Sequence, residues 1–196
     1  GDAEVFSLSV TKLMTSVEGG MIASRNEALL QRLKKMRNYG IEENYNAYWP
    51  GLNGKMSEFH AIVGIQNLRH LPELLRKRSD NARYYTAAIE RRAASRVIPL
   101  QKGVVHTFKD FTIMLPPKLK PKRDSMMKSL ADRGVETRAY FYPPVHEQKF
   151  FQRFADRPLP LTEDYSRRVI TLPFYTTISE QEMDYVADSL VEAERS

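Results

Sequence analysis

Cysteine is absent from this chain of 196 residues. Its absence excludes disulfides, thiolate nucleophiles and cysteine-based zinc sites, and it fits a reducing compartment. Long apolar runs are missing as well, because uninterrupted hydrophobic stretches extend over only a few residues, and this excludes a membrane-spanning helix. We therefore expect no membrane partner and a cytoplasmic location.

Histidine is scarce and scattered. The chain has four histidines, and no two of them stand at the i, i+4 spacing that places two ligands on one helix face. The Gly-x-Ser-x-Gly elbow of hydrolases and the Gly-x-Gly-x-x-Gly phosphate loop are also absent. The sequence therefore predicts no metal site, and it gives no support to a Ser-His-Asp hydrolase.

The charge balance is basic, with a formal net charge of +6, but the basic residues are spread along the chain. The densest run lies at residues 118–123 and reads KLKPKR. Such a run can bind nucleic acid, but no aromatic residues interleave its charges as a base-stacking surface requires. We interpret it as a solvated loop before a helix and expect no nucleic-acid partner. A mild positive field also suits a substrate that carries a diphosphate.

Hydrophobic periodicity and turn residues predict an alternation of strands and helices. Strands are expected over residues 5–10, 20–23, 97–100, 108–115 and 135–142. Helices are expected from Asn26 to Gly40, from Ser57, from Pro72, from Asp124 to Arg133, and from Ser179 to Glu194. Ser179 with a glutamate three residues later forms a capping box. The stretch 41–55, rich in Asn, Tyr, Gly and Pro, is expected to be a loop.

This order favours a compact α/β unit in the last hundred residues, with a mixed sheet and helices on one side. The first fifty residues supply only a fragment of a larger sheet. Apolar strands of this kind are normally covered on both faces, so we expect them to be exposed in the isolated chain.

One lysine stands out from the others by its surroundings. Residues 6–20 read FSLSVTKLMTSVEGG, which is an apolar strand ending in hydroxyls and Lys12, followed by a Gly-Gly turn. A lysine at such a strand end can be shifted toward its neutral form, which attacks carbonyls and forms a Schiff base. The alternative is an ordinary solvated surface lysine.

The whole run resembles the lysine segment of the DegT/DnrJ/StrS sugar-nucleotide aminotransferases, which use pyridoxal phosphate (PLP). That segment reads approximately Phe-Ser-Phe-His-x-Thr-Lys-x-x-x-x-Gly-Glu-Gly-Gly. The chain departs from it at Ser9, where His is usual, and at Val17, where Gly is usual. It matches at Phe6, Ser7, Thr11, Lys12, Glu18, Gly19 and Gly20.

Other parts of the chain are similar to family patterns in the same order. Residues 33–40 resemble a helix end, and residues 51–58 resemble Gly-Tyr-Asn-Tyr-Arg-Met-Ser-Glu with Lys55 in place of Arg. Residues 140–146 resemble a Tyr-Pro-His segment, and residues 171–182 resemble a closing Leu-Pro and helix start. Several matches in the right order are a far stronger signal than any one alone.

The resemblance implies an α/β fold, namely the C-terminal half of a fold type I PLP-dependent transferase. It divides the chain into a fragment of the large PLP-binding domain at 1–56, linking helices at 57–93 and a small α/β domain at 94–196. The other half would carry the aromatic residue stacked on the cofactor and the carboxylate that pairs with its pyridine nitrogen. We therefore expect the isolated chain to be inactive or weakly active.

The resemblance also assigns roles to residues. Lys12 would be the catalytic lysine that binds PLP, Ser7 would contact the cofactor phosphate, and Asn53 would reach the phosphate bound by the partner subunit of a homodimer. Lys55, Tyr142 and His146 are candidates for substrate contacts. The implied reaction transfers an amino group from an amino acid, usually glutamate, to a nucleotide-linked keto sugar for polysaccharide or related pathways.

A second hypothesis is a non-catalytic remnant that keeps a dimerisation or binding surface. The departures at Ser9 and Val17 favour the remnant, whereas the retained Ser7, Lys12 and Asn53 favour the enzyme. A basic nucleic-acid binder is the weakest hypothesis because it depends on charge alone.

Overall fold

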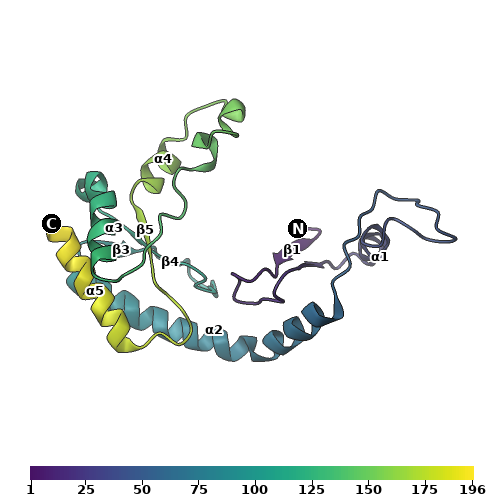
Figure 1. Ribbon diagram of the computed structural model, residues 1–196, viewed down its shortest axis with the longest axis horizontal. Helices are drawn as coiled ribbons and strands as arrows, with labels where there is room; N and C mark the ends of the chain where they lie inside the picture. The colour runs from purple at the N-terminus through teal and green to yellow at the C-terminus, as the bar shows by residue number, and fades with distance from the viewer. The chain divides into compact units, whose positions relative to one another are not determined.

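The computed structural model describes residues 1–196, and the chain divides into two units, Gly1–Glu73 and Leu74–Ser196. No helix in it is both long enough and apolar enough to traverse a lipid bilayer. Figure 1 traces the chain from one terminus to the other. The elements of the first unit are β1 (Glu4–Ser7), β2 (Gly20–Ala23), α1 (Glu27–Met36) and the start of α2 (Glu58–Arg92). Those of the second unit are the rest of α2, β3 (Arg96–Val97), β4 (Phe111–Met114), η1 (Pro117–Lys122), α3 (Arg123–Asp132), η2 (Val145–Glu147), η3 (Gln152–Phe154), α4 (Pro160–Ser166), β5 (Val169–Leu172) and α5 (Glu180–Arg195).

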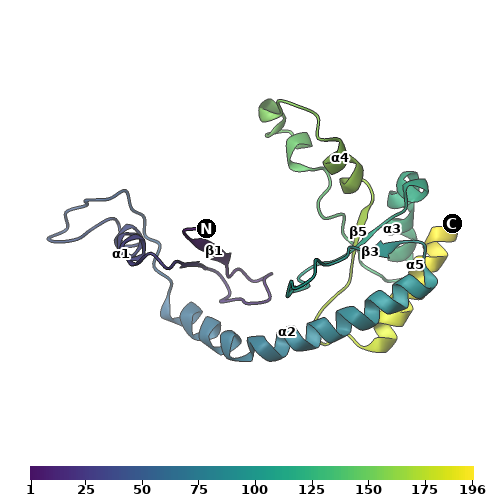
Figure 2. The same ribbon diagram turned by 180° about the vertical axis from the view of Figure 1, so that it is seen from behind.

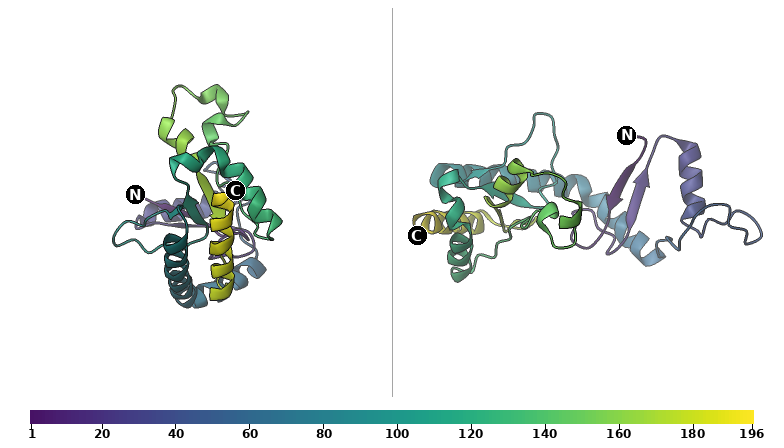
Figure 3. Two further views of the ribbon diagram at one scale, coloured as in Figure 1. Left: turned by 90° about the vertical axis from the view of Figure 1, so that its left-hand side faces the viewer. Right: turned by 90° about the horizontal axis from the view of Figure 1, so that it is seen from above.

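In the first unit, β1 and β2 form an antiparallel pair that begins at Glu4 opposite Ala23 and ends at Ser7 opposite Gly20. The right-hand view of Figure 3 shows the two strands side by side. Every residue of both strands is exposed, including Val5 and Ile22. The expectation that these apolar strands would be left uncovered is confirmed.

Helix α1 begins after the predicted cap Asn26 but ends at Met36, four residues before the predicted stop at Gly40. The Asn26 side chain accepts a hydrogen bond from the backbone N–H of Leu29 at 3.0 Å, which satisfies a donor that the helix leaves free. Gly40 follows the helix with a φ of +72°, and a Cβ at this position would overlap the carbonyl oxygen of Trp49. Only glycine meets both requirements.

Helix α2 corrects the prediction that Pro72 begins a separate helix. Residues Glu58–Arg92 form one continuous helix with Pro72 inside it. Proline in a helix interior costs about 3 kcal/mol because one backbone hydrogen bond is lost. The helix continues because residues on both sides of Pro72 are anchored, with Asn67 contacting residue Thr15 and with Tyr85 fully buried. The division into three parts inferred from the resemblance stays a prediction.

The sheet of the second unit is antiparallel throughout, in the order β3-β4-β5, so the expected mixed sheet is wrong. Phe111 and Ile113 of β4 are buried, whereas Thr112 and Met114 are half-buried, so one face of the sheet carries the core. The core side chains from the α-helices are Ala82, Tyr85, Ala88 and Ile89 of α2, Met126 and Leu130 of α3, and Met183, Val186, Ala187, Leu190 and Ala193 of α5. Figure 2 shows α5 running beside the C-terminal part of α2.

The strand expected over 135–142 does not form. Only Arg138 pairs with the sheet, through two backbone hydrogen bonds to Thr171 of 3.1 and 2.7 Å. The chain then leaves the sheet, and residues 140–158 contain short 3₁₀ turns and loops, because Pro143 and Pro144 cannot donate to a ladder. This segment and α4 project away from the sheet in Figure 1.

The two predicted helices of this unit are present. Helix α3 begins at Arg123, so the expected cap Asp124 lies inside the helix, and its carboxylate accepts from the Arg123 guanidinium at 2.8 Å. Helix α5 has the predicted capping box, in which Ser179 and Glu182 exchange backbone and side-chain hydrogen bonds. The sequence did not predict α4.

Candidate functional site

A closed loop follows β1 and carries the lysine that the sequence singles out. The Leu8 N–H donates to the carbonyl of Gly19 and the Ser16 N–H donates to the carbonyl of Leu8, both at 2.9 Å. Leu8 is buried beneath the loop. Lys12 lies in a turn at the middle of the loop, where its N–H donates to the carbonyl of Ser9 at 3.0 Å, and its side chain is half-buried. The loop thus holds an amine at the end of a strand without enclosing it.

Two serine hydroxyls lie where β1 ends. Ser7 Oγ is 3.5 Å from Ser9 Oγ and 3.5 Å from the Ser9 backbone nitrogen. Both distances are at the limit of hydrogen bonding, so these donors remain available for a stronger acceptor. Hydroxyl and backbone donors suit a phosphate group, and the Lys12 amine suits an aldehyde. The donor set therefore fits a phosphorylated aldehyde cofactor.

The last residues of the loop are held by hydrogen bonds within the loop itself. The Thr15 hydroxyl donates to the carbonyl of Leu8 at 3.2 Å and accepts from the N–H of Val17 at 3.0 Å. The fully buried Ser16 donates its hydroxyl to the carbonyl of Glu18 at 3.0 Å. Val17 has a φ of +71°, a left-handed conformation that β-branched residues rarely adopt. Thr15 thus fixes the strained residue that stands where the family pattern has glycine.

Helix α2 touches this loop at two residues that the sequence reading missed. The Asn67 side-chain amide donates to the carbonyl of Thr15 at 2.8 Å. Gly64 faces Ser16 so closely that a Cβ at residue 64 would lie 3.2 Å from the Ser16 Cβ. Asn67 is 52 residues from Thr15 in the sequence, so no local pattern could have revealed the contact.

Asn53 and Lys55 lie on a segment that pairs with the end of α1. Asn53 forms an isolated antiparallel bridge with Asn38, and its side chain is exposed. The Lys55 ammonium donates to the Asn38 side-chain oxygen at 3.1 Å and lies 4.2 Å from the centre of the Tyr39 ring. Both residues belong to the same unit as Ser7 and Lys12.

Tyr142 and His146 belong to the second unit. The Arg123 guanidinium lies 4.3 Å from the centre of the Tyr142 ring. His146 Nε2 is 3.4 Å from Glu163 Oε1 and has no closer hydrogen-bond partner. The backbone N–H of Leu159 holds the pKa of Glu163 below its ordinary value, and His146 contributes in the same direction.

His146, Glu147 and Glu163 are the one group of side chains whose geometry could hold a metal ion, with ligand atoms within 4.8 Å of one another. Both carboxylates already have protein partners. Glu147 forms an ion pair with Arg167 at 2.6 Å, and Glu163 accepts the Leu159 N–H at 2.9 Å. The cluster therefore needs no cation for charge balance.

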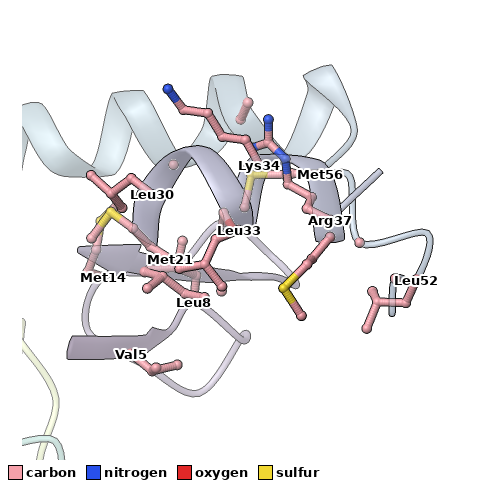
Figure 4. A pocket seen from close by; sticks show the side chains of 18 of the residues that line it. Val5, Leu8, Met14, Met21, Leu30, Leu33, Lys34, Arg37, Leu52 and Met56 are labelled. Atoms are coloured by element: carbon pink, nitrogen blue, oxygen red, sulfur yellow. The ribbon is translucent and has the colours of Figure 1, made fainter. Parts of the chain in front are cut away.

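The first unit also contains an apolar cavity of about 930 Å³ (Figure 4). Lys34 and Arg37 are its only charged lining residues, and none of the predicted site residues lines it. The labelled apolar side chains of Figure 4 are Val5, Leu8, Met14, Met21, Leu30, Leu33, Leu52 and Met56. The cavity is therefore lined by other residues than those predicted for the site.

Curated relatives align with nearly the whole chain but with only part of their own length. A GDP-perosamine synthase of Vibrio cholerae is 26% identical over 199 residues, which cover 97% of this chain and 52% of that protein. A dTDP-4-amino-4,6-dideoxy-D-glucose transaminase of Shigella dysenteriae is 23% identical, with 98% of this chain and 53% of the relative covered. The chain thus spans about half the length of the curated relatives it matches.

Solved structures share the fold. DesI, solved in the presence of its TDP-sugar product, superposes with a TM-score of 0.89 at 30% identity, over 99% of this chain and 50% of DesI. The aminotransferase PseC of Helicobacter pylori gives a TM-score of 0.91 at 22% identity, over 100% of this chain and 54% of PseC. These matches confirm the expected α/β fold. A family model described as the DegT/DnrJ/EryC1/StrS aminotransferase family matches residues 1–191, and the chain belongs to this family.

Proposed function

We propose that this chain is the C-terminal half of a PLP-dependent aminotransferase that acts on a nucleotide-linked keto sugar, with Lys12 as its catalytic lysine. The observation that carries the proposal is the closed loop after β1, in which the Lys12 N–H donates to the carbonyl of Ser9 and the Ser7 and Ser9 hydroxyls lie at the end of the strand. This loop lies within a family match that extends over residues 1–191.

The names of the relatives support the substrate class. Those matched above are a synthase of GDP-perosamine and a transaminase of a dTDP-linked amino sugar, and DesI was solved with a TDP-sugar product. All three names contain a sugar linked to a nucleoside diphosphate. We therefore propose a substrate of this class, with glutamate as the amino donor that the family resemblance implies.

Lys12 and Ser7 would have separate roles toward the cofactor. PLP, when bound, supplies an aldehyde that condenses with amines and a ring that acts as an electron sink. Lys12 Nζ would hold the cofactor in the resting enzyme and, once displaced by the substrate amine, would carry protons to and from the reacting carbon. Ser7 would donate its hydroxyl to the cofactor phosphate.

Asn53 and Lys55 would act across a homodimer. Both are exposed, and an amide adds two donors to a phosphate without adding charge. Asn53 would therefore reach the cofactor phosphate held by a second copy of the chain. Lys55 would lie near anionic groups there, but its ammonium cannot make the bidentate contact of the usual arginine.

Tyr142 and His146 remain candidates for contacts with the sugar or its nucleotide. The exposed ring of Tyr142 is fixed from one side by Arg123, which leaves a polar hydroxyl and an apolar face for a ligand. His146 is half-buried beside Glu163, so a hydrogen bond to a substrate hydroxyl would compete with this carboxylate.

Covalent trapping tests the proposal. The chain is mixed with PLP, reduced with borohydride and digested, and the modified lysines are identified by mass spectrometry. We expect the label to be confined to Lys12, to disappear in Lys12→Ala and to persist in Lys34→Ala, the control at an exposed lysine of α1. We also expect weak retention, because ring stacking and the pyridine partner would come from the other half.

Labelling spread over many lysines would overturn the assignment and favour the non-catalytic remnant. One observation suits that alternative, since the exposed strands β1 and β2 and the apolar cavity provide a surface for another polypeptide. Sedimentation of the unlabelled chain then distinguishes a stable dimer from a monomer.

A further inference from the structure

We infer that Asn67 of α2 is a positioning residue for the Lys12 amine. The inference rests on the proposed role of Lys12, and it assigns a function to a side chain that lies outside the lysine segment. According to this inference, Asn67 does not touch the cofactor or the reacting atoms. It acts by fixing the peptide that carries the far end of the Lys12 loop.

The contact that carries the inference is the hydrogen bond from the Asn67 amide to the carbonyl of Thr15 at 2.8 Å. It joins a helix to a loop across 52 residues of sequence. Asn67 is half-buried, so water can replace this donor only in part. The carbonyl of Thr15 would lose most of its stabilisation if the amide were removed.

Thr15 transmits this restraint to both ends of the loop. Its hydroxyl donates to the carbonyl of Leu8, where the loop leaves β1, and accepts from the N–H of Val17, where the loop turns back. Lys12 lies between Leu8 and Thr15 along the chain. A rotation of the Thr15 peptide would therefore shift the segment that carries the amine.

Val17 makes the restraint necessary. A β-branched residue in the left-handed region favours a return to extended backbone, and that return would break the hydrogen bond from its N–H to Thr15. Gly64 also meets the loop, at Ser16, but it only provides space. Asn67 is the one side chain of α2 that holds the loop by a directed hydrogen bond, and a site held from a rigid helix is more precise than one held by its own loop.

Three substitutions separate positioning from general packing. Asn67→Asp keeps the shape but places a carboxylate against the Thr15 carbonyl. Asn67→Leu keeps a similar volume and leaves that carbonyl without its donor. Asn67→Gln retains an amide donor on a longer side chain and is the rescue variant. Gln66→Leu is the matched control, because Gln66 is the exposed neighbour on the same helix and has no contact with the loop.

Two measurements are made on the full chain. Hydrogen exchange of peptides covering residues 8–19 reports the order of the loop without any cofactor. Trapping with PLP and borohydride reports the fraction of label at Lys12 relative to all other lysines. We expect Asn67→Asp and Asn67→Leu to speed exchange in the loop and to lower the Lys12 fraction by about threefold to tenfold, as the loss of one hydrogen bond would allow.

The pattern across the variants decides the inference. Recovery of the Lys12 fraction in Asn67→Gln, with no change in Gln66→Leu, supports positioning. If the wild-type chain is labelled at Lys12 and the Asp and Leu variants are labelled equally well, the inference is overturned while the proposed function stands. If the wild-type chain shows no preference for Lys12, the proposed function is lost and the inference is lost with it.

Discussion

Val17 of the candidate site has a backbone conformation that its β-branched side chain disfavours. Its φ of +71° places Cβ against the carbonyl oxygen, at a cost of roughly 1–2 kcal/mol for an L-residue. Glycine avoids this cost but loses more conformational entropy on folding, by about 0.4–1 kcal/mol. We predict that Val17→Gly stabilises the Lys12 loop by about 0.5–1 kcal/mol, the difference between these two effects. Native-state hydrogen exchange of the Leu8 and Ser16 amides measures the change.

Val17→Ala is the control for this prediction. Alanine removes the β-branch but keeps the Cβ that clashes, so we expect it to relieve less strain than glycine. Slower exchange in the alanine variant than in the glycine variant would show that branching, and not the left-handed backbone, is what strains the loop.

Tyr85 presents a different conflict in the second unit. Its ring stacks on Phe111 with centroids 4.7 Å apart, but its hydroxyl is buried without a hydrogen-bond partner, and burial raises its pKa. A buried hydroxyl without a partner costs about 1–3 kcal/mol. We predict that Tyr85→Phe keeps the stack and raises the free energy of unfolding by about 1 kcal/mol. Urea denaturation followed by circular dichroism tests this, and a destabilised variant would reveal a partner for the hydroxyl.

At the scale of elements, Asp184 of α5 contacts two side chains of α2. Asp184 accepts from the Arg92 guanidinium at 2.6 Å and from the Tyr84 hydroxyl at 2.9 Å. Arg92 first, and then Tyr84, lower the pKa of Asp184 in the folded protein. In the unfolded chain the same carboxyl titrates near its ordinary value of about 3.9.

The sign of the pH dependence follows from this difference. The folded state binds the proton of Asp184 less readily than the unfolded state, so the contact stabilises the fold above about pH 4 and this contribution is lost as the pH falls toward the lower folded value. We predict that Asp184→Asn flattens the decline of stability between about pH 5 and pH 2. Urea midpoints over this range measure it, and Asp156→Asn, at an exposed residue without an ion pair, should leave the decline unchanged.

Elements with local signals could be predicted from the sequence, and elements that depend on distant partners could not. The Asn26 cap and the Ser179 capping box involve residues three apart, and both are present. The expected strand over 135–142 failed because strand pairing needs a partner that the sequence pattern does not name. The prediction that Pro72 begins a separate helix was wrong because anchoring on both sides of Pro72 outweighs the local cost of proline.

The same distinction applies to the candidate site. Ser7 and Lys12 were found because a strand end, its hydroxyls and a lysine lie within a few consecutive residues. Asn67 was missed because its contact with Thr15 depends on how the loop lies on α2. Val17 was noticed only as a departure from the family pattern, and its left-handed backbone gives that departure a physical meaning.

At the scale of the whole molecule, the two units differ sharply in how much they bury. Leu8 is the only large hydrophobic side chain buried in the first unit, whereas the second unit contains a continuous core that includes Ile113 and Leu190. Apolar burial is the dominant favourable term in folding. The first unit should therefore be the less stable of the two in the isolated chain.

The single tryptophan makes this difference measurable. Trp49 belongs to the first unit, where its indole N–H donates to Glu42 at 2.7 Å, so its fluorescence reports that unit alone. We predict that the urea midpoint from Trp49 fluorescence lies below the midpoint from circular dichroism, because most of the helical residues belong to the second unit. Ile113→Ala should lower the free energy of unfolding of the second unit by about 2–5 kcal/mol, because it removes a fully buried side chain. The midpoint from Trp49 fluorescence should stay unchanged. Coincident transitions that shift together in this variant would instead show that the two units unfold as one cooperative structure.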